Sequence, residues 1–186
     1  MIDPSKSTVL RAGLAALALA VAPALAAAQG GEVGSLKLGG SIGLFASSFD
    51  TTGVQLRLDG TYTFSELQPR LYLEGAGHLA AMFGSNDVSV WEAVPKARLR
   101  YALSDQLSVY GDVGLGLAIL HVSIPDIFGG GSENTLSAII RFAGGVLYAI
   151  RPDKIWLTLE PVGINVYTAS GSGFAYTLLA GVLVRL

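Results

Sequence analysis

Residues 174–186 restrict the fold of this 186-residue chain more than any other segment does. Every second side chain in this segment is apolar, from Phe174 through Leu178 to Leu186, and aromatic residues stand at its start. Such alternation predicts a strand with one apolar face. In an open sheet this strand would leave an unpaired apolar edge, which promotes aggregation. Closure into a barrel removes the edge, so we predict that this strand pairs with the first strand of the chain.

The hydropathy of the chain indicates a membrane protein without membrane-spanning helices. Mean hydropathy is +0.53, and 14% of the residues are charged, whereas a soluble domain has about 25%. A transmembrane helix needs ~20 unbroken apolar residues. The best candidate after the N-terminal region, residues 136–150, is interrupted by Arg141, Gly144 and Gly145. Apolar residues that are spread in alternation predict a transmembrane β-barrel.

The N-terminal region has the features of a secretory signal peptide. Lys6 and Arg11 supply positive charge, and residues 12–22 are uncharged and rich in Ala and Leu. Cleavage is expected after Ala26 or Ala28, and the apolar run is too short for a signal anchor that spans a bilayer. The absence of cysteine excludes a lipoprotein and disulfides. The expected segments are a cleaved signal peptide at 1–28, a short periplasmic segment at 29–34 and a barrel at 35–186.

Period-two alternation recurs eight times along the chain. In the second strand, Leu56 and Leu58 share one face while Arg57 lies on the other. The seventh strand changes phase near Pro161, which predicts a bulge, and Pro95 within the fourth strand predicts a local distortion. The expected strands span residues 35–47, 54–64, 70–83, 90–103, 107–122, 135–150, 155–166 and 174–186.

The connections between these strands alternate in length. The short ones are residues 65–69, 104–106 and 151–154, and the longer ones are residues 48–53, 84–89, 123–134 and 169–173. Bacterial barrels have an even number of strands, short periplasmic turns and longer external loops. The sequence therefore predicts an all-β, eight-stranded, antiparallel up-and-down barrel with its N- and C-termini both on the periplasmic side.

Aromatic side chains on the apolar faces cluster near the expected strand ends. Those near the short connections are Tyr62, Phe64, Tyr101 and Tyr148, and those near the long connections are Phe83, Trp91, Phe174 and Tyr176. General enrichment of aromatic residues in strands explains their presence but not their clustering. Two aromatic girdles around an apolar band are typical of membrane barrels.

Residues 35–186 resemble the small eight-stranded outer-membrane barrels of the OmpA and OmpX type. The resemblance implies a Gram-negative outer-membrane protein in contact with lipid and lipopolysaccharide. It also implies recognition of the C-terminal strand by the barrel assembly machinery, although family members usually end on an aromatic residue and this chain ends on Leu186. No peptidoglycan-binding domain follows, so a bare barrel is expected. The alternative architecture is a secreted lipocalin-like barrel with its apolar face inside, but the polar faces lack the Lys–Glu pairs of a solvated surface.

Charged residues on the polar faces are expected to line the lumen. The basic ones are Lys37, Arg57, Lys96, Arg98, Arg100, Arg141 and Arg185, and the acidic ones are Asp59, Glu74, Glu92, Asp112 and Glu160. One interpretation is a plug of ion pairs, since the interior of an eight-stranded barrel is filled by side chains and isolated buried charges are costly. The other interpretation is a narrow pore or small-solute channel with a net positive lining.

Evidence for catalysis or cofactor binding in the sequence is weak. Lipid A deacylases on such barrels use a His-x-Ser pair with a Glu, and His121, Ser123 and Glu133 are similar in type alone. A lipid-modifying enzyme is therefore the third hypothesis, after a structural or surface-interacting barrel and a pore. His78 is expected to be a hydrogen-bonded lumen residue. With two His and no Cys, neither a transition-metal site nor another cofactor is expected, and no basic stripe indicates nucleic-acid binding.

The long connections form an acidic outer rim. They contain Asp50, Asp87, Asp126 and Glu133 but neither Lys nor Arg. Solubility alone accounts for acidic loops. A more specific hypothesis is that these carboxylates bind divalent cations that bridge to anionic lipopolysaccharide, because carboxylates are hard oxygen ligands.

Overall fold

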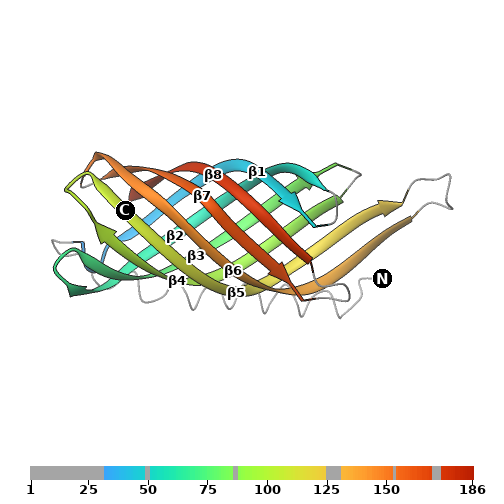
Figure 1. Cartoon of the computed structure of the whole chain (residues 1–186), viewed down its shortest axis with the longest axis horizontal. Coiled ribbons are helices and arrows are strands. Elements are labelled where there is room, and N and C mark those ends of the chain that lie inside the picture. Colours follow the sequence, from blue (N-terminus) through green and yellow to red (C-terminus); the bar gives the residue numbers. More distant parts are fainter. Residues whose placement is uncertain (1–31, 49–50, 86–87, 125–130, 153, 169–172) are drawn as a thin grey trace.

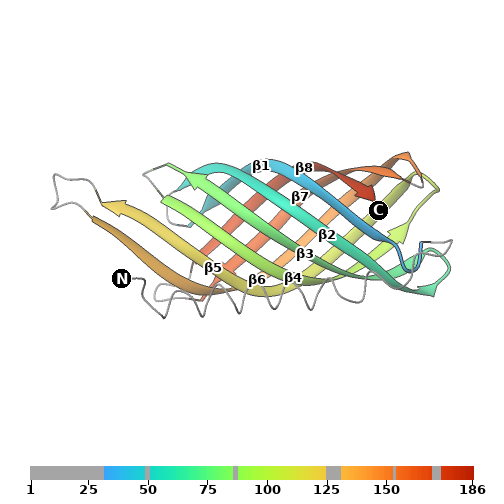
Figure 2. The same ribbon diagram turned by 180° about the vertical axis from the view of Figure 1, so that it is seen from behind.

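The structure is a computed structural model that describes residues 32–48, 51–85, 88–124, 131–152, 154–168 and 173–186. Eight strands form a closed antiparallel barrel in chain order (Figures 1 and 2). The strands are β1 (Leu36–Ser47), β2 (Thr52–Gln68), β3 (Leu71–Gly84), β4 (Val88–Ala102), β5 (Leu107–Ile124), β6 (Gly131–Arg151), β7 (Ile155–Tyr167) and β8 (Gly173–Arg185). Within these residues, no helix is long and apolar enough to cross a membrane. The expected signal peptide lies outside the described residues.

The barrel closes where β1 pairs with β8, as the C-terminal alternation predicts. The register places Leu44 opposite Leu178. Two glycines of β1 allow the strands to approach closely at this seam. A Cβ at Gly39 would lie 1.8 Å from the Val182 carbonyl oxygen, and one at Gly43 would lie 1.9 Å from that of Leu178. A larger residue at either position would therefore push the seam apart.

Proline affects the ladders in two different ways. In β7, the register with β8 shifts between Glu160 and Gly163, which confirms the bulge predicted near Pro161. In β4, Pro95 lies opposite Gly77 of β3 without a shift. The ladder with β5 skips Val94 and Pro95 and keeps the same register on both sides. The distortion expected at Pro95 is thus limited to a gap in one ladder, because proline lacks one donor but fits an extended backbone.

Strand ends differ from the sequence expectation by more than two residues at two connections. Strand β2 continues to Gln68 through two register shifts, so the turn is confined to residues 69–70 instead of 65–69. Arg70 has φ of 71°, and its N–H donates to Glu66 Oε1 at 2.9 Å. At the other end, β5 and β6 pair as far as Ile124 and Gly131, and their hairpin projects beyond the other strands (Figure 1). Residues 123–124 and 131–134 of the expected 123–134 loop are therefore strand, because cross-strand hydrogen bonds extend the ladder past the apolar pattern.

The apolar faces point outward. Leu115 is 66% exposed, whereas Arg141 is fully buried. Among the leucines expected to contact lipid, Leu73 is half-buried and the others are exposed, namely Leu38, Leu56, Leu99, Leu115 and Leu178. This arrangement excludes the lipocalin-like alternative, whose apolar face would be inside.

We expect nitroxide labels on Leu56→Cys and Leu115→Cys to contact acyl chains in bilayers. Oxygen, which partitions into the membrane, should relax both labels strongly, while a water-soluble nickel complex should not. A label on Ser104→Cys, in an exposed turn, should respond to the nickel complex. Protection of both leucine sites from oxygen would contradict the outward orientation.

Candidate functional site: the charged lumen

The periplasmic end of the lumen is organised around Glu74 of β3. Its Oε1 accepts hydrogen bonds from Arg100 Nε at 2.8 Å and from Thr63 Oγ1 at 3.1 Å, and Lys37 Nζ lies 3.6 Å away. Arg100 also forms an ion pair with Glu32, which precedes β1. Glu74 therefore joins charges from β1, β3 and β4.

Glu32 belongs to the segment that the sequence analysis assigned to a short periplasmic stretch. Gly34 turns the chain there with φ of 82°, a conformation that favours glycine. Its N–H donates to the Thr63 carbonyl at 2.8 Å, and the Ser35 hydroxyl donates to the Glu32 carbonyl at 2.6 Å. These bonds hold Glu32 over the periplasmic mouth, so an acid that lies before the alternating pattern becomes part of the lumen.

Two aspartates link the basic residues in the middle of the barrel. Asp59 accepts a hydrogen bond from Arg57 Nε at 2.9 Å, and Asp112 accepts one from Arg98 Nη2 at 2.8 Å. Lys96 Nζ lies between them, 3.6 Å from an oxygen of each. Three cations thus share two carboxylates.

Glu160 of β7 supplies further compensation for this group of cations. Its Oε1 accepts a hydrogen bond from Arg57 Nη1 at 2.9 Å and also pairs with Arg141. Tyr110 donates to Glu160 Oε2 at 3.2 Å and stacks under the Arg98 guanidinium, 3.9 Å from its carbon to the ring centre. Glu160 is therefore the counter-charge that the buried Arg57 and Arg141 share.

A second polar chain runs from Arg141 toward the external end. Arg141 donates to the Asn165 side-chain oxygen, and Asn165 Nδ2 donates to Glu92 Oε1 at 3.0 Å. Tyr167 also donates to Glu92, at 2.6 Å. His78 lies beside this carboxylate with Nε2 3.6 Å from Glu92 Oε2. Glu92 is thus held by two neutral donors.

The expectation that His78 is hydrogen-bonded is wrong, although the residue does face the lumen. Neither ring nitrogen has a hydrogen-bond partner within the described structure. The Glu92 oxygen nearest to the imidazole, Oε2, accepts a hydrogen bond from Asn165 Nδ2 at 3.3 Å and lies 3.6 Å from His78 Nε2, which is beyond bonding distance.

Eleven of the twelve predicted lumen charges are buried, with exposed fractions of 8% or less. The twelfth, Arg185, is half-buried at the short-turn end. Glu32 was not among the predicted lumen residues, and Tyr110, Asn165 and Tyr167 were not predicted as partners of the charges. Once the phase change near Pro161 is taken into account, Tyr110, Asn165 and Tyr167 have the same alternation phase as the inward-facing charges of their strands, and this phase could have identified them as lumen residues.

Apolar side chains pack inside the barrel on both sides of the charges. At the long-connection end the cluster comprises Phe45, Met82, Val90, Val94, Ala118, Ile139, Tyr167 and Ala175. At the short-turn end it comprises Tyr110, Leu147, Ala149, Trp156 and Leu183. Lys37 Nζ lies 4.9 Å from the centre of the Trp156 ring, so the apolar cluster at the short-turn end also contacts a cation.

The predicted girdle residues lie on the outer surface. All are exposed except Tyr62, which is half-buried against Phe64 with ring centres 5.0 Å apart. Phe83 and Trp91 form a second edge-to-face pair at 6.3 Å. The two pairs lie at opposite ends of the barrel, near short and long connections respectively.

The structure describes only part of the acidic rim and of the weak catalytic motif. Asp50, Asp87 and Asp126 lie outside the described residues, as does the Ser123 side chain, while Glu133 is exposed. His121 Nδ1 lies 2.8 Å from Asn134 Oδ1 on the neighbouring strand. Glu133 precedes Asn134, so strand alternation directs it to the other face from His121. No group of three potential metal ligands occurs among the described residues.

Comparison with known families agrees with this geometry. The family model of the outer membrane protein beta-barrel domain matches residues 12–185. The chain belongs to this family. It is therefore a protein of the bacterial outer membrane, and its outward apolar face contacts membrane lipid. Among curated proteins, no significant sequence match was found.

Solved structures with the same fold include barrels of different kinds. Neisserial surface protein A superposes with a TM-score of 0.61 and 18% identity, over 82% of this chain and 96% of that one. Ail, the attachment invasion locus protein of Yersinia pestis, superposes with a TM-score of 0.56 and 14% identity, over 82% of this chain and 97% of that one. The outer membrane enzyme PagL superposes with a TM-score of 0.53 and 14% identity, over 78% of this chain and 97% of that one. At these identities the likeness shows the fold, which enzymes and other barrels share.

We expect Glu160→Gln to lower the free energy of unfolding by about 3–5 kcal/mol, because Arg57 and Arg141 would lose their shared counter-charge. The measurement is urea unfolding of the refolded barrel in lipid vesicles, followed by tryptophan fluorescence. Glu133→Gln is the matched control, since Glu133 is exposed and its change should stay below about 0.5 kcal/mol. Equal effects of the two substitutions would contradict a stabilising role for the buried pairs.

Proposed function

We propose that this protein is a structural and surface-interacting barrel whose lumen does not conduct. One observation carries this proposal. Five buried polar side chains from β2, β6, β7 and β8 have no exposed surface, namely Gln55, Arg141, Glu160, Asn165 and Thr177. Water does not reach these atoms, and a hydrated ion is larger than a water molecule.

The charge balance inside the barrel also argues against an ion pathway. The six basic side chains with ion pairs are Lys37, Arg57, Lys96, Arg98, Arg100 and Arg141. They face six acids, Glu32, Asp59, Glu74, Glu92, Asp112 and Glu160. Glu32 thus brings the acids of this network to six, equal to its six basic side chains, while the seventh predicted basic residue, Arg185, lies half-buried at the short-turn end outside this count.

Support for a surface role comes from the external end. Strand β6 pairs with β7 only from Ile139 onward, whereas it pairs with β5 from Gly131. The β5–β6 hairpin thus rises above its neighbours (Figure 2). Two barrels of the same fold are described as a surface protein and an attachment protein. We extend that class of role to this chain, with the projecting hairpin as its contact surface.

A lipid-modifying activity is the less favoured alternative. The enzyme PagL shares the fold. In this chain, however, the ring of His121 is engaged by Asn134 at 2.8 Å, and alternation along β6 separates Glu133 from that ring. A base and its orienting carboxylate need to lie on the same side of the sheet, which favours a barrel without this chemistry.

The finer partner assignments are also proposals. We infer that β8 presents the signal for the barrel assembly machinery, because its apolar outward face runs to the end of the strand. We also infer that the acidic rim binds divalent cations that bridge to lipopolysaccharide. The exposed Glu133 and the absence of Lys and Arg from the long connections support this second inference.

In planar bilayers we expect the refolded protein to show no conductance steps. The double substitution Arg141→Ser/Glu160→Ser removes two fully buried lumen side chains of opposite charge and leaves Arg57 paired with Asp59, so it should introduce small, ohmic steps. Heat-modifiable gel mobility would show that the variant has folded. Steps from the unsubstituted protein, with the selectivity of a narrow pore, would contradict a closed lumen.

Calcium should raise the melting temperature of the barrel in lipopolysaccharide-containing bilayers but not in phospholipid alone. The physical reason is that carboxylates and lipid phosphates share the cation. A variant with Asp50, Asp87, Asp126 and Glu133 changed to the corresponding amides is the control and should lose the increase. The same calcium effect in both proteins would exclude bridging at the rim.

A further inference from the structure

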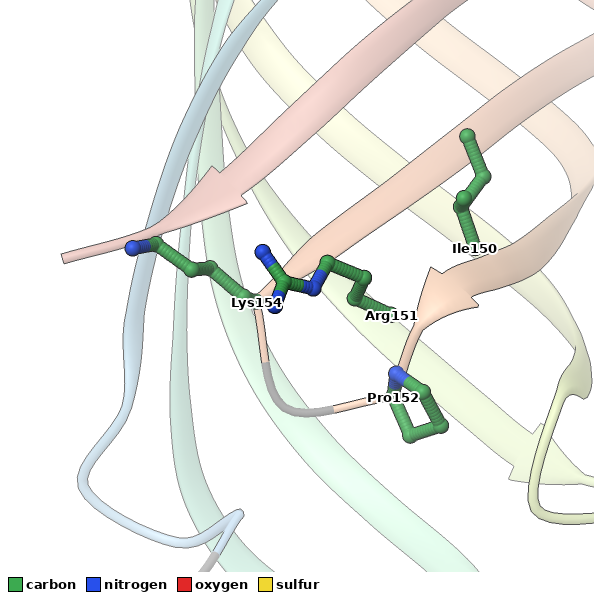
Figure 3. A pocket seen from close by; sticks show the side chains of 4 residues that line it. All are labelled: Ile150, Arg151, Pro152 and Lys154. Atoms are coloured by element: carbon green, nitrogen blue, oxygen red, sulfur yellow. The ribbon is translucent and has the colours of Figure 1, made fainter.

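A shallow hollow lies at the turn between β6 and β7, at the short-turn end of the barrel. Its volume is about 360 Å³, and its lining residues are Ile150, Arg151, Pro152 and Lys154. Figure 3 shows both basic side chains extending to the same side of the turn, with Arg151 reaching toward Lys154. The N–H of Arg185 donates to the Lys154 carbonyl at 2.9 Å, which fastens the turn to the end of β8. The hollow therefore presents two cations on an anchored turn.

These two cations differ from those of the lumen. Arg151 and Lys154 are exposed, and in the part of the chain that the structure describes neither forms an ion pair. The lumen cations, by contrast, all have carboxylate partners. Residues 151–154 carry a net charge of +1 with the acid between them counted. Positive charge thus remains available to an external anion.

The outward side chains of β6 show the membrane level of this turn. Tyr148 of the periplasmic girdle is 46% exposed, and Ile150, the next residue on the same face, is 53% exposed. Aromatic girdles mark the membrane–water interface. Arg151 and Lys154 follow immediately, so they lie at the level of the lipid headgroups. Long basic side chains at that depth extend toward the polar region while their stems contact apolar groups.

We propose that the β6–β7 turn binds the phosphodiester headgroup of an anionic phospholipid in the periplasmic leaflet. Arg151 offers the planar pair of donors that suits phosphate oxygens, and Lys154 adds a second positive charge. Ile150 and Tyr148 provide apolar surface for the upper acyl chain. A soluble phosphate would contact only Arg151 and Lys154. Because these cations lie directly beside the lipid-facing Tyr148 and Ile150, the arrangement favours a membrane lipid.

The test uses nanodiscs that contain equal amounts of phosphatidylglycerol and phosphatidylcholine, with co-purified lipid measured by native mass spectrometry. The unsubstituted barrel should retain phosphatidylglycerol preferentially. Arg151→Gln and Lys154→Gln should each reduce this preference about fivefold, as expected for ~1 kcal/mol per basic residue near anionic lipid. Both residues are exposed, so the variants should fold, which gel mobility would verify.

The matched control is Arg70→Gln. Arg70 is an exposed basic residue on another short turn at the same end, and its Nη1 donates to the Leu103 carbonyl at 3.3 Å. Its loss should leave the lipid preference unchanged. An equal decrease in this control, or no decrease in the two turn variants, would overturn the proposal. Displacement of the lipid by free glycerol phosphate at low concentration would instead identify a soluble-phosphate site, which also overturns it.

Discussion

The hydrogen-bonded seam between β1 and β8 is the constraint on which the rest of the structure depends. Inside a bilayer no water satisfies an open strand edge, so a sheet must close to cross the membrane. Closure with eight strands directs one face of every strand to lipid and encloses a narrow interior. Closure also requires glycine at two positions of the seam, Gly39 and Gly43, because the β8 backbone occupies the space that their side chains would need.

A narrow interior then determines how its charges are arranged. A buried charge without a partner is strongly destabilising, whereas a shared carboxylate compensates several cations at once. Glu160 contacts Arg57 and Arg141, and Glu74 contacts Lys37 and Arg100. The same side chains that fill the lumen thereby neutralise it. The same side chains thus provide both packing and charge compensation, which supports our proposal that the barrel is closed to ions.

Period-two alternation was sufficient to predict the strands, the outward position of Leu56 and the inward position of Arg57, because each strand faces lipid on one side. It also located the bulge at Pro161. It could not identify the partners across the lumen. Arg57 and Glu160 are 103 residues apart, and their meeting depends on the stagger of the strands around the barrel, which no local pattern encodes. Glu32 was missed for a related reason, since it precedes the first alternating residues and enters the lumen through the turn at Gly34.

The closed, balanced interior places the remaining chemistry at the two edges of the barrel. Charges within the lumen are matched by neighbours a few ångströms away, so their fields largely cancel outside. On the β6–β7 turn, the exposed Arg151 and Lys154 form no ion pair among the described residues, and the long connections carry only acidic formal charges. The periplasmic leaflet supplies phosphodiesters, and the external leaflet supplies lipopolysaccharide. On our two proposals, the basic turn attracts the first directly, whereas the acidic connections need a cation between themselves and the second. The two edges of one sheet are thereby suited to different lipid chemistries without any contribution from the lumen.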